Sequence, residues 1–222
     1  MPETPSPRAL SDLPYSRHLT PLAGELTDGE RHDLDCVRLD GGSYAGLDAP
    51  GLRLTESALT SVSFSGGRLR RARFNDVWMH TVRFVGTDLA ETSWLDTEFT
   101  AGVLAGLELH GAALHRVVFH QCKFDSVNLR ATTLRDVVFV DCLLRDADFA
   151  GARLSGVSFP GSTLEGARFA GAGLKDVDLR SAARLDIGDG VESLRGATIS
   201  TLQLFDLAPR FAHALGVVVR DD

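Results

Sequence analysis

The chain has 222 residues, 44% of them hydrophobic, and a formal net charge of −7 at pH 7. It contains no run of about 18 apolar residues, which excludes a membrane-spanning helix of the usual kind. Its three cysteines do not make a disulfide framework, and its first residues lack the basic and apolar regions of a signal peptide. We therefore expect a globular, cytoplasmic protein of one or two domains.

The first 33 residues differ from the rest of the chain. They contain five prolines and no regular spacing of apolar side chains. Positions 1–35 carry seven acidic and three basic residues, so the chain begins with a negative charge. We expect residues 1–33 to form a Pro-rich arm that is either mobile or lies as a strap over the first part of the fold.

An apolar residue occupies every fifth position from Leu39 to Leu179, which makes 29 positions without a change of register. A second series, two residues earlier in the repeat, consists mostly of small residues. A period of five fits neither the 3.6 residues per turn of a helix nor the alternation of a strand. A chain that turns a corner every five residues and closes a square coil every twenty keeps both series inside. Stacked coils then rise by about 4.8 Å, the spacing of paired strands.

Several five-residue segments carry a recognisable consensus. The clearest are residues 147–151 (ADFAG), 152–156 (ARLSG), 167–171 (ARFAG) and 177–181 (VDLRS). They resemble the A(D/N)LxX repeat of the pentapeptide-repeat family. The resemblance implies an all-β, right-handed quadrilateral (pentapeptide-repeat) β-helix over residues 34–200, dimeric through a short C-terminal α-helical cap.

The repeat is interrupted near its end. Arg184 and Asp189 fall on the next two inward positions, where a charge would be buried, and glycines flank position 189. We therefore expect a loop insertion at about 181–193. Leu194, Ala197 and Ile199 return to the original phase and predict a last turn of the coil.

Residues 201–222 are expected to cover the exposed strands at the end of the coil and to form a dimerisation segment. Ser200 or Thr201 can cap a first helical turn, Asp206 can cap a second that tolerates Pro209, and Gly216 is a stop signal. Apolar residues lie on two sides of this segment, so we expect one side to contact the rod and the other a second subunit. The alternative is that both sides are buried within one chain. The predicted homodimer interface contains Leu202, Leu204, Phe205, Leu207, Phe211 and Leu215.

No sequence motif for catalysis or phosphate binding is present, so we expect no enzyme activity and no cofactor. His110, His115 and His120 are grouped in the sequence, but a spacing of five places them on successive faces of a square coil. Since metal ligands must converge on one ion, we expect no metal site. The basic residues near position 70 are interpreted as a solvated corner rather than as a site for direct binding of nucleic acid.

One outward series repeats every twenty residues and is rich in carboxylates. We call it the acid ladder; it contains Glu56, Asp76, Asp96, Asp136 and Asp176. Some members of the family that the repeats resemble, including the mycobacterial fluoroquinolone-resistance protein, imitate duplex DNA and bind DNA gyrase. The resemblance therefore implies a DNA-mimicking ligand of DNA gyrase or a related type II topoisomerase. Residues 36–181 carry seventeen acidic and sixteen basic side chains, so any imitation of DNA has to be local.

Two alternatives to this function remain open. The ladder carboxylates can form ion pairs between coils and serve only to solvate the rod. The protein can also be a general protein–protein interaction scaffold without topoisomerase activity, which binds through the 181–193 segment or through an apolar strip. The strip contains Trp78, Val118, Val138 and Val140 on one face and Val85, Val103 and Leu143 on the next.

Overall fold

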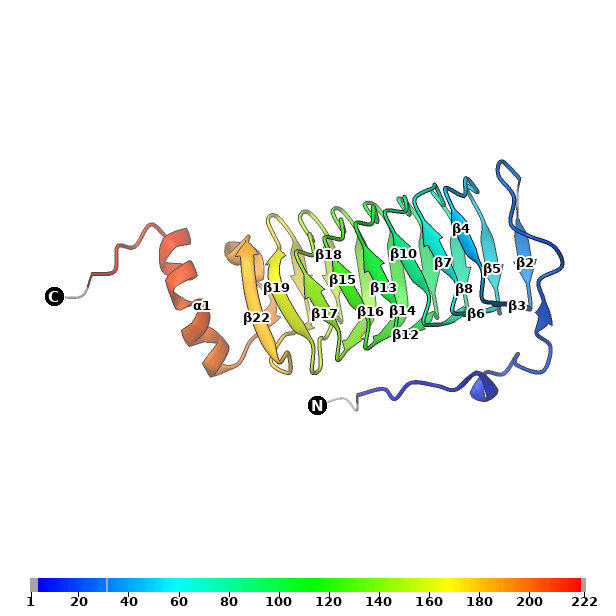
Figure 1. Ribbon diagram of the computed structural model, residues 1–222. Helices are drawn as coiled ribbons and strands as arrows, with labels where there is room; N and C mark the ends of the chain where they lie inside the picture. The colour runs from blue at the N-terminus through cyan, green and yellow to red at the C-terminus, as the bar shows by residue number, and fades with distance from the viewer. Residues whose placement is uncertain (1–3, 31, 221–222) are drawn as a thin grey trace.

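The computed structural model describes residues 4–30 and 32–220, and its main body is a rod of stacked coils (Figure 1). The N-terminal residues run along the outside of the rod, and a helix lies at its far end (Figure 1). From Asp33 onward, strands in neighbouring coils pair in parallel with partners twenty residues apart, as Leu54 with Phe74 and Phe84 with Leu104. The predicted all-β coil of twenty residues is therefore confirmed.

The coil has four faces. The first face contains β2 (Asp33–Asp35), β5 (Arg53–Thr55), β8 (Arg73–Asn75), β11 (Ser93–Leu95), the first halves of β14 (Ala113–His120) and β16 (Thr133–Val140), β18 (Arg153–Ser155) and β20 (Gly173–Lys175). The second contains β1 (Thr20–Pro21), β3 (Val37–Asp40), β6 (Ala58–Thr60), β9 (Trp78–His80), β12 (Glu98–Thr100), the second halves of β14 and β16, β21 (Val177–Asp178) and β23 (Ala197–Thr198).

The third face contains β4 (Ser43–Ala45), β7 (Ser63–Ser65), β10 (Arg83–Val85), β13 (Val103–Ala105), β15 (Lys123–Asp125), β17 (Leu143–Arg145), β19 (Thr163–Arg168) and β22 (Arg184–Asp189). Along the fourth face the coils pair through single bridges, such as Asp48 with Arg68 and Arg68 with Asp88. Two short 3-10 helices, η1 (Leu10–Asp12) and η2 (Val191–Leu194), and one α-helix, α1 (Thr201–Ala214), complete the described structure.

Both inward series fill the axis of the rod. Phe119, Phe139 and Phe159 stack on one another with ring centroids 5.1 and 5.0 Å apart, one ring in each successive coil. Val117 and Val137, from the smaller series, are fully buried beside them. Each buried Leu or Phe stabilises the fold by about 1.5–3 kcal/mol. This burial explains why two inward residues in each five-residue repeat are enough to hold the coils together.

Each corner of the coil is made by one residue in the left-handed backbone region. From position 36 to position 176 every fifth residue has φ between +43° and +76°. Glycine adopts this conformation freely, whereas other residues are strained by about 1–2 kcal/mol, with Asp and Asn the most tolerant. The strict five-residue period therefore reflects a repeated backbone conformation as well as a repeated inward side chain.

The segment from 181 to 193 is not the loop insertion that the sequence predicts. Strand β22 pairs with β19, and Leu164 lies opposite Leu185, twenty-one residues away. This shift of one residue leaves Arg184 exposed and buries Leu185 and Ile187 in its place. The coil therefore continues through an irregular turn because the register adjusts to keep the charge outside.

Helix α1 is one continuous helix instead of two short turns. Ser200 caps it: its hydroxyl accepts a hydrogen bond from the Gln203 backbone, and the Gln203 side chain accepts one from the Ser200 backbone. Asp206 lies inside the helix, as does Pro209, and the helix ends before Gly216, whose φ is +71°. Its inner side buries Gln203 and Leu207 against the end of the rod.

Candidate functional site

The acid ladder lies at the corner between the first and second faces, where five coils each contribute one carboxylate. All five of its residues have the left-handed backbone conformation, and so do Cys36, Arg116 and Gly156, which occupy the three remaining positions of the same column between 36 and 176. Left-handed strain by itself favours Asp at any corner. The other three corner columns, however, carry one carboxylate each, Glu91, Asp141 and Asp146. Backbone conformation therefore does not explain why the carboxylates gather at this corner.

The middle of the ladder is neutralised. The guanidinium of Arg116 donates two hydrogen bonds to Asp96, from Nε to Oδ1 at 2.5 Å and from Nη2 to Oδ2 at 2.6 Å. These bonds hold the pKa of Asp96 below its usual value. Oδ2 of Asp136 lies 3.6 Å from Nε of Arg135 and 3.6 Å from Nε2 of His115, so these contacts are longer than those between Asp96 and Arg116. The ladder is thus interrupted by one strong ion pair.

Asp76 differs from its neighbours in the ladder. It is half-buried, and no hydrogen bond or ion pair of its side chain is described. Burial raises the pKa of Asp76, and the nearby carboxylates of Asp96 and Glu56 raise it further. Glu56, Asp136 and Asp176 are exposed. The carboxylates of Glu56, Asp76 and Asp96 thus lie close enough to act on one another, although Arg116 neutralises Asp96.

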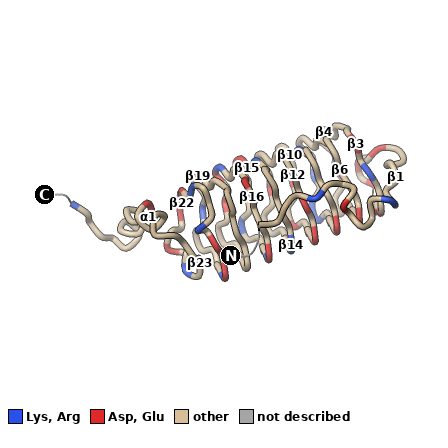
Figure 2. The backbone as a smooth tube through the Cα atoms, turned by 90° about the horizontal axis from the view of Figure 1, so that it is seen from below, with Lys and Arg blue, Asp and Glu red and all other residues tan. Residues whose placement is uncertain are grey.

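Elsewhere on the rod, carboxylates pair with arginines from neighbouring coils. Examples are Arg71 with Glu91 at 2.8 Å and Arg68 with Asp48 at 2.5 Å. Figure 2 shows acidic and basic positions interspersed along the rod. The nearly neutral balance of the repeat region thus corresponds to alternating charges on its surface, and the acid ladder is a local departure from it.

The N-terminal arm lies beside the ladder, on the second face. Leu13 and Tyr15 are buried against Ala58 and Trp78, and the indole nitrogen of Trp78 donates a hydrogen bond to the carbonyl of Arg8 at 3.1 Å. Arg8 in turn donates to the carboxylate of Glu98, from its backbone nitrogen at 2.7 Å and from Nε at 2.6 Å. Glu98 is only 4% exposed. The described arm is therefore a strap, and it reaches beyond the first coil.

This arrangement changes the interpretation of the apolar strip. Trp78 is covered by the arm and is not a free surface, and Val140 is buried. Val118 and Val138 continue the same column beyond Glu98 and are half-buried. Glu98 is not among the residues predicted from the sequence, although a carboxylate that stands between Trp78 and Val118 in its column could have identified it.

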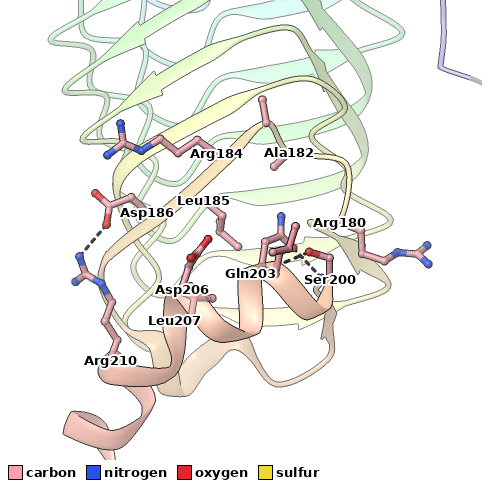
Figure 3. A pocket seen from close by; sticks show the side chains of 12 residues that line it. Arg180, Ala182, Arg184, Leu185, Asp186, Ser200, Gln203, Asp206, Leu207 and Arg210 are labelled. Atoms are coloured by element: carbon pink, nitrogen blue, oxygen red, sulfur yellow. Dashed lines mark hydrogen bonds and ion pairs between the residues drawn. The ribbon is translucent and has the colours of Figure 1, made fainter. Parts of the chain in front are cut away.

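A cavity of about 560 Å³ lies between the end of the rod and one side of α1 (Figure 3). Three arginines line it, and each is paired: Arg180 with Asp178 at 2.7 Å, Arg184 with Glu165 at 3.3 Å and Arg210 with Asp186 at 2.7 Å. The side chain of Gln203 donates to the carbonyl of Leu179 at 2.7 Å. Gln203 and Arg210 therefore join the helix to the rod, and the three arginines of the cavity are already paired.

The predicted dimer residues divide between the two sides of α1. Leu207 is 2% exposed and Phe211 packs against the core, so these two residues contact the rod within one chain. The prediction that they face a second subunit is therefore wrong, because the helix needs them to close the end of the coil. The outer side is apolar and exposed at Leu202 (77%), Phe205 (69%) and Leu215 (79%), and Leu204 is 48% exposed.

The histidines lie apart and in different surroundings. His110 lies 3.4 Å from Glu108, His115 borders the ladder, and His120 is buried, which lowers its pKa. Among residues 4–30 and 32–220, no three His, Cys, Asp or Glu side chains are arranged to hold a metal ion. The same residues include no helix with the length and hydropathy needed to cross a membrane.

Residues 92–169 match a family model described as the pentapeptide repeat region. No curated protein matches the chain. Among solved structures, a trypsin-treated variant of QnrB1, a plasmid-mediated fluoroquinolone resistance protein, is 16% identical with a TM-score of 0.56, covering 90% of this chain and 96% of that one. HetL, which is involved in heterocyst differentiation regulation in the cyanobacterium Nostoc, is 20% identical with a TM-score of 0.41, covering 78% and 91%. The similarity to QnrB1 shows a shared fold.

Proposed function

Because the chain belongs to the pentapeptide-repeat family, we propose that it is a non-enzymatic binding protein whose acid ladder occupies the DNA-binding surface of a type II topoisomerase such as DNA gyrase. The observation that carries this proposal is the distribution of corner carboxylates. Five lie in one column and one in each of the other three, although all four columns have the same backbone conformation.

The spacing of the ladder supports imitation of a nucleic-acid strand. Coils that pair as parallel strands repeat about every 4.8 Å, and one strand of duplex DNA carries a phosphate about every 3.4 Å. A ladder with one charge per coil therefore approaches the charge spacing of a single strand over a few coils. The correspondence is best at Glu56 and Asp76, since Arg116 neutralises Asp96, the next carboxylate of the column.

Two further considerations direct the proposal to topoisomerases. The repeats resemble those of family members that bind DNA gyrase, and the similarly folded QnrB1 is a fluoroquinolone resistance protein. At 16% identity that similarity extends to the fold, so the partner in this chain rests on the ladder and on the family resemblance.

Inhibition of gyrase supercoiling by the purified protein tests the proposal. We expect micromolar protein to inhibit, and the triple substitution of Asp76, Asp96 and Asp136 by Asn to relieve the inhibition. The matched control replaces Glu91 by Gln and Asp141 and Asp146 by Asn, which removes the same charge from the other three corners. Equal loss of inhibition in both variants would indicate a general charge effect, and no inhibition by the wild type would contradict the proposal.

We also propose that the protein is a homodimer that forms through the outer side of α1. Leu202, Phe205 and Leu215 expose apolar side chains there, and Val217, Val218 and Val219 extend the apolar surface beyond the helix. Burial of this surface against a second copy of the chain would stabilise the dimer by about 25 cal/mol per Å² of apolar surface removed from water. A general interaction scaffold is the second candidate function, favoured by the covered apolar face beneath the arm.

A further inference from the structure

The contact between the N-terminal arm and the second face has the features of a peptide bound to a recognition site. Arg8 makes three hydrogen bonds to this face: it donates two to the carboxylate of Glu98, and its carbonyl accepts one from the indole of Trp78. Five and seven residues further along, Leu13 and Tyr15 fill the apolar surface over Ala58 and Trp78. The arm therefore binds as an extended segment with a cationic anchor and two apolar anchors.

Glu98 has no role in building the coil. Its nearest neighbours in the column are Ala58 and Trp78 on one side and Val118 and Val138 on the other, and the coil keeps the same register through all of them. Polar residues stand only farther along the column, as at Arg38, Ser158 and Asp178. With the arm in place Glu98 is only 4% exposed, so a segment that covers it has to bring a cationic partner, because a carboxylate that is buried and unpaired is strongly unfavourable. His120 lies nearby, but burial lowers its pKa and so disfavours its charged form. The site therefore selects for a guanidinium from outside the rod.

The rod does not depend on the arm for its core. Leu13, Tyr15, Ala58 and Trp78 form a small cluster of their own, separate from the continuous core of the rod. Apart from Leu13 and Tyr15, the arm residues from 4 to 19 are exposed or half-buried. Such a segment can leave the surface without opening the coil.

The fit of the arm is incomplete. A cavity of about 410 Å³ remains between Pro7–Leu10 and the side chains of Trp78, His80 and Thr100. The hydroxyl oxygen of Thr100 is buried and has no hydrogen-bond partner among the described residues. A buried polar atom without a partner is uncommon and unfavourable, so an occupant that supplies the missing partner would bind more tightly than the arm.

From these contacts we infer that the face formed by Ala58, Trp78, Glu98 and Thr100 is a docking site for an extended, arginine-bearing segment of a partner protein, and that the chain's own arm occupies this site in its absence. The partner segment places an arginine on Glu98 and apolar side chains over Ala58 and Trp78, and a polar group of the segment reaches Thr100. This surface is distinct from the acid ladder, and the inference does not depend on the proposed binding to a topoisomerase.

The test uses the full-length chain with the double substitution Arg8→Glu and Leu13→Asp, which removes both kinds of anchor from the arm. Acrylamide quenching of tryptophan fluorescence should increase, since Trp78 becomes exposed while Trp94 stays 1% exposed in the core. Ser11→Ala, in the exposed part of the arm, is the matched control and should leave quenching unchanged. Unchanged quenching in the double variant would overturn the inference; if that variant does not fold, Arg8→Gln alone replaces it.

The released face is then screened with a library of random twelve-residue peptides, and a synthetic peptide of residues 4–16 calibrates the binding. We expect enrichment of peptides with an arginine and apolar residues about five and seven positions later, some of them binding more tightly than the arm peptide. Adding Glu98→Gln should weaken this binding tenfold or more, since the charge-assisted hydrogen bonds are lost.

Several results would overturn the inference. Absence of arginine enrichment, or the same enrichment on the Glu98→Gln background, would mean that the face does not recognise a guanidinium. Binding of the arm peptide without any tighter peptide would identify the arm as an intramolecular strap only. Arm-dependent dimers in light scattering would assign the site to a second copy of the chain instead of a partner.

Discussion

Arg116 occupies the one basic position of the acid ladder and binds the carboxylate of Asp96 in the preceding coil, at 2.5 and 2.6 Å. The two residues are twenty apart, so the pair joins equivalent corners of adjacent coils. Their side chains are 49% and 35% exposed, so solvent and salt screen the pair and it adds little to the stability of the fold. It removes negative charge from the centre of the proposed binding surface.

Arg116→Gln should therefore strengthen binding to a topoisomerase. The change frees Asp96 and adds one unit of negative charge to the ladder; we expect roughly two- to fivefold tighter binding at low ionic strength, fading as salt screens the charge. Titration of supercoiling inhibition at several salt concentrations measures the effect. Arg145→Gln removes a positive charge that pairs with Glu165 near the opposite corner and should change binding less.

Asp76→Asn should stabilise the protein near neutral pH. Burial and the neighbouring carboxylates raise the pKa of Asp76 above its unfolded value, so its ionised form destabilises the fold at neutral pH. This penalty disappears as the pH falls through the folded pKa and then below the unfolded value of about 3.9. Asn also tolerates the left-handed backbone at this corner.

Thermal unfolding as a function of pH measures this effect. We expect a melting temperature higher by roughly 1–2 °C at pH 7, which corresponds to about 0.5 kcal/mol, and a smaller difference at pH 4. A difference that stays constant with pH would show that Asp76 titrates as an ordinary exposed carboxyl.

Ala131→Gly should stabilise the rod, whereas Gly151→Ala should destabilise it. Both residues stand in the same corner column, with φ of +54° and +66°. A Cβ atom at position 151 would meet nothing within 4 Å, so the effect reports backbone strain without a clash. Left-handed strain of about 1–2 kcal/mol is partly offset by the entropy of glycine, which leaves about 1 kcal/mol in opposite directions. Urea unfolding measures the free energy of unfolding of both variants. A change of the same sign in the two variants would contradict the proposed backbone strain.

Phe205→Glu should convert the proposed dimer to a monomer. Phe205 is 69% exposed on the outer side of α1, where a charge costs little in the monomer and much in a closed interface. Light scattering at several concentrations measures the mass. Asp206→Asn, on the neighbouring residue that lines the cavity beside the rod, is the control and should keep the wild-type mass. A monomeric wild-type protein would rule out the dimer.

The sequence by itself determined the coil and its regular corners from position 36 to position 176. Each inward side chain and each turn recurs at a fixed distance along the chain. The period alone therefore assigns a residue to one face and one coil of the rod, and it does so for the five carboxylates of the ladder. The pairing of Arg116 with Asp96 also follows from this period, since the two residues are one coil apart. The sequence alone therefore predicts the concentration of carboxylates at one corner.

Only the tertiary structure decided how the non-repeating segments attach to the rod. The arm has no period, and its contact between Arg8 and Glu98 joins residues ninety positions apart, fixed by burial of Trp78 and by the need of a buried carboxylate for a cation. At the other end, Leu207 faces the rod because the last coil requires a cover, and Leu185 replaces Arg184 inside because a shift of one residue costs less than a buried charge. These choices depend on competition between distant surfaces, which local spacing does not encode.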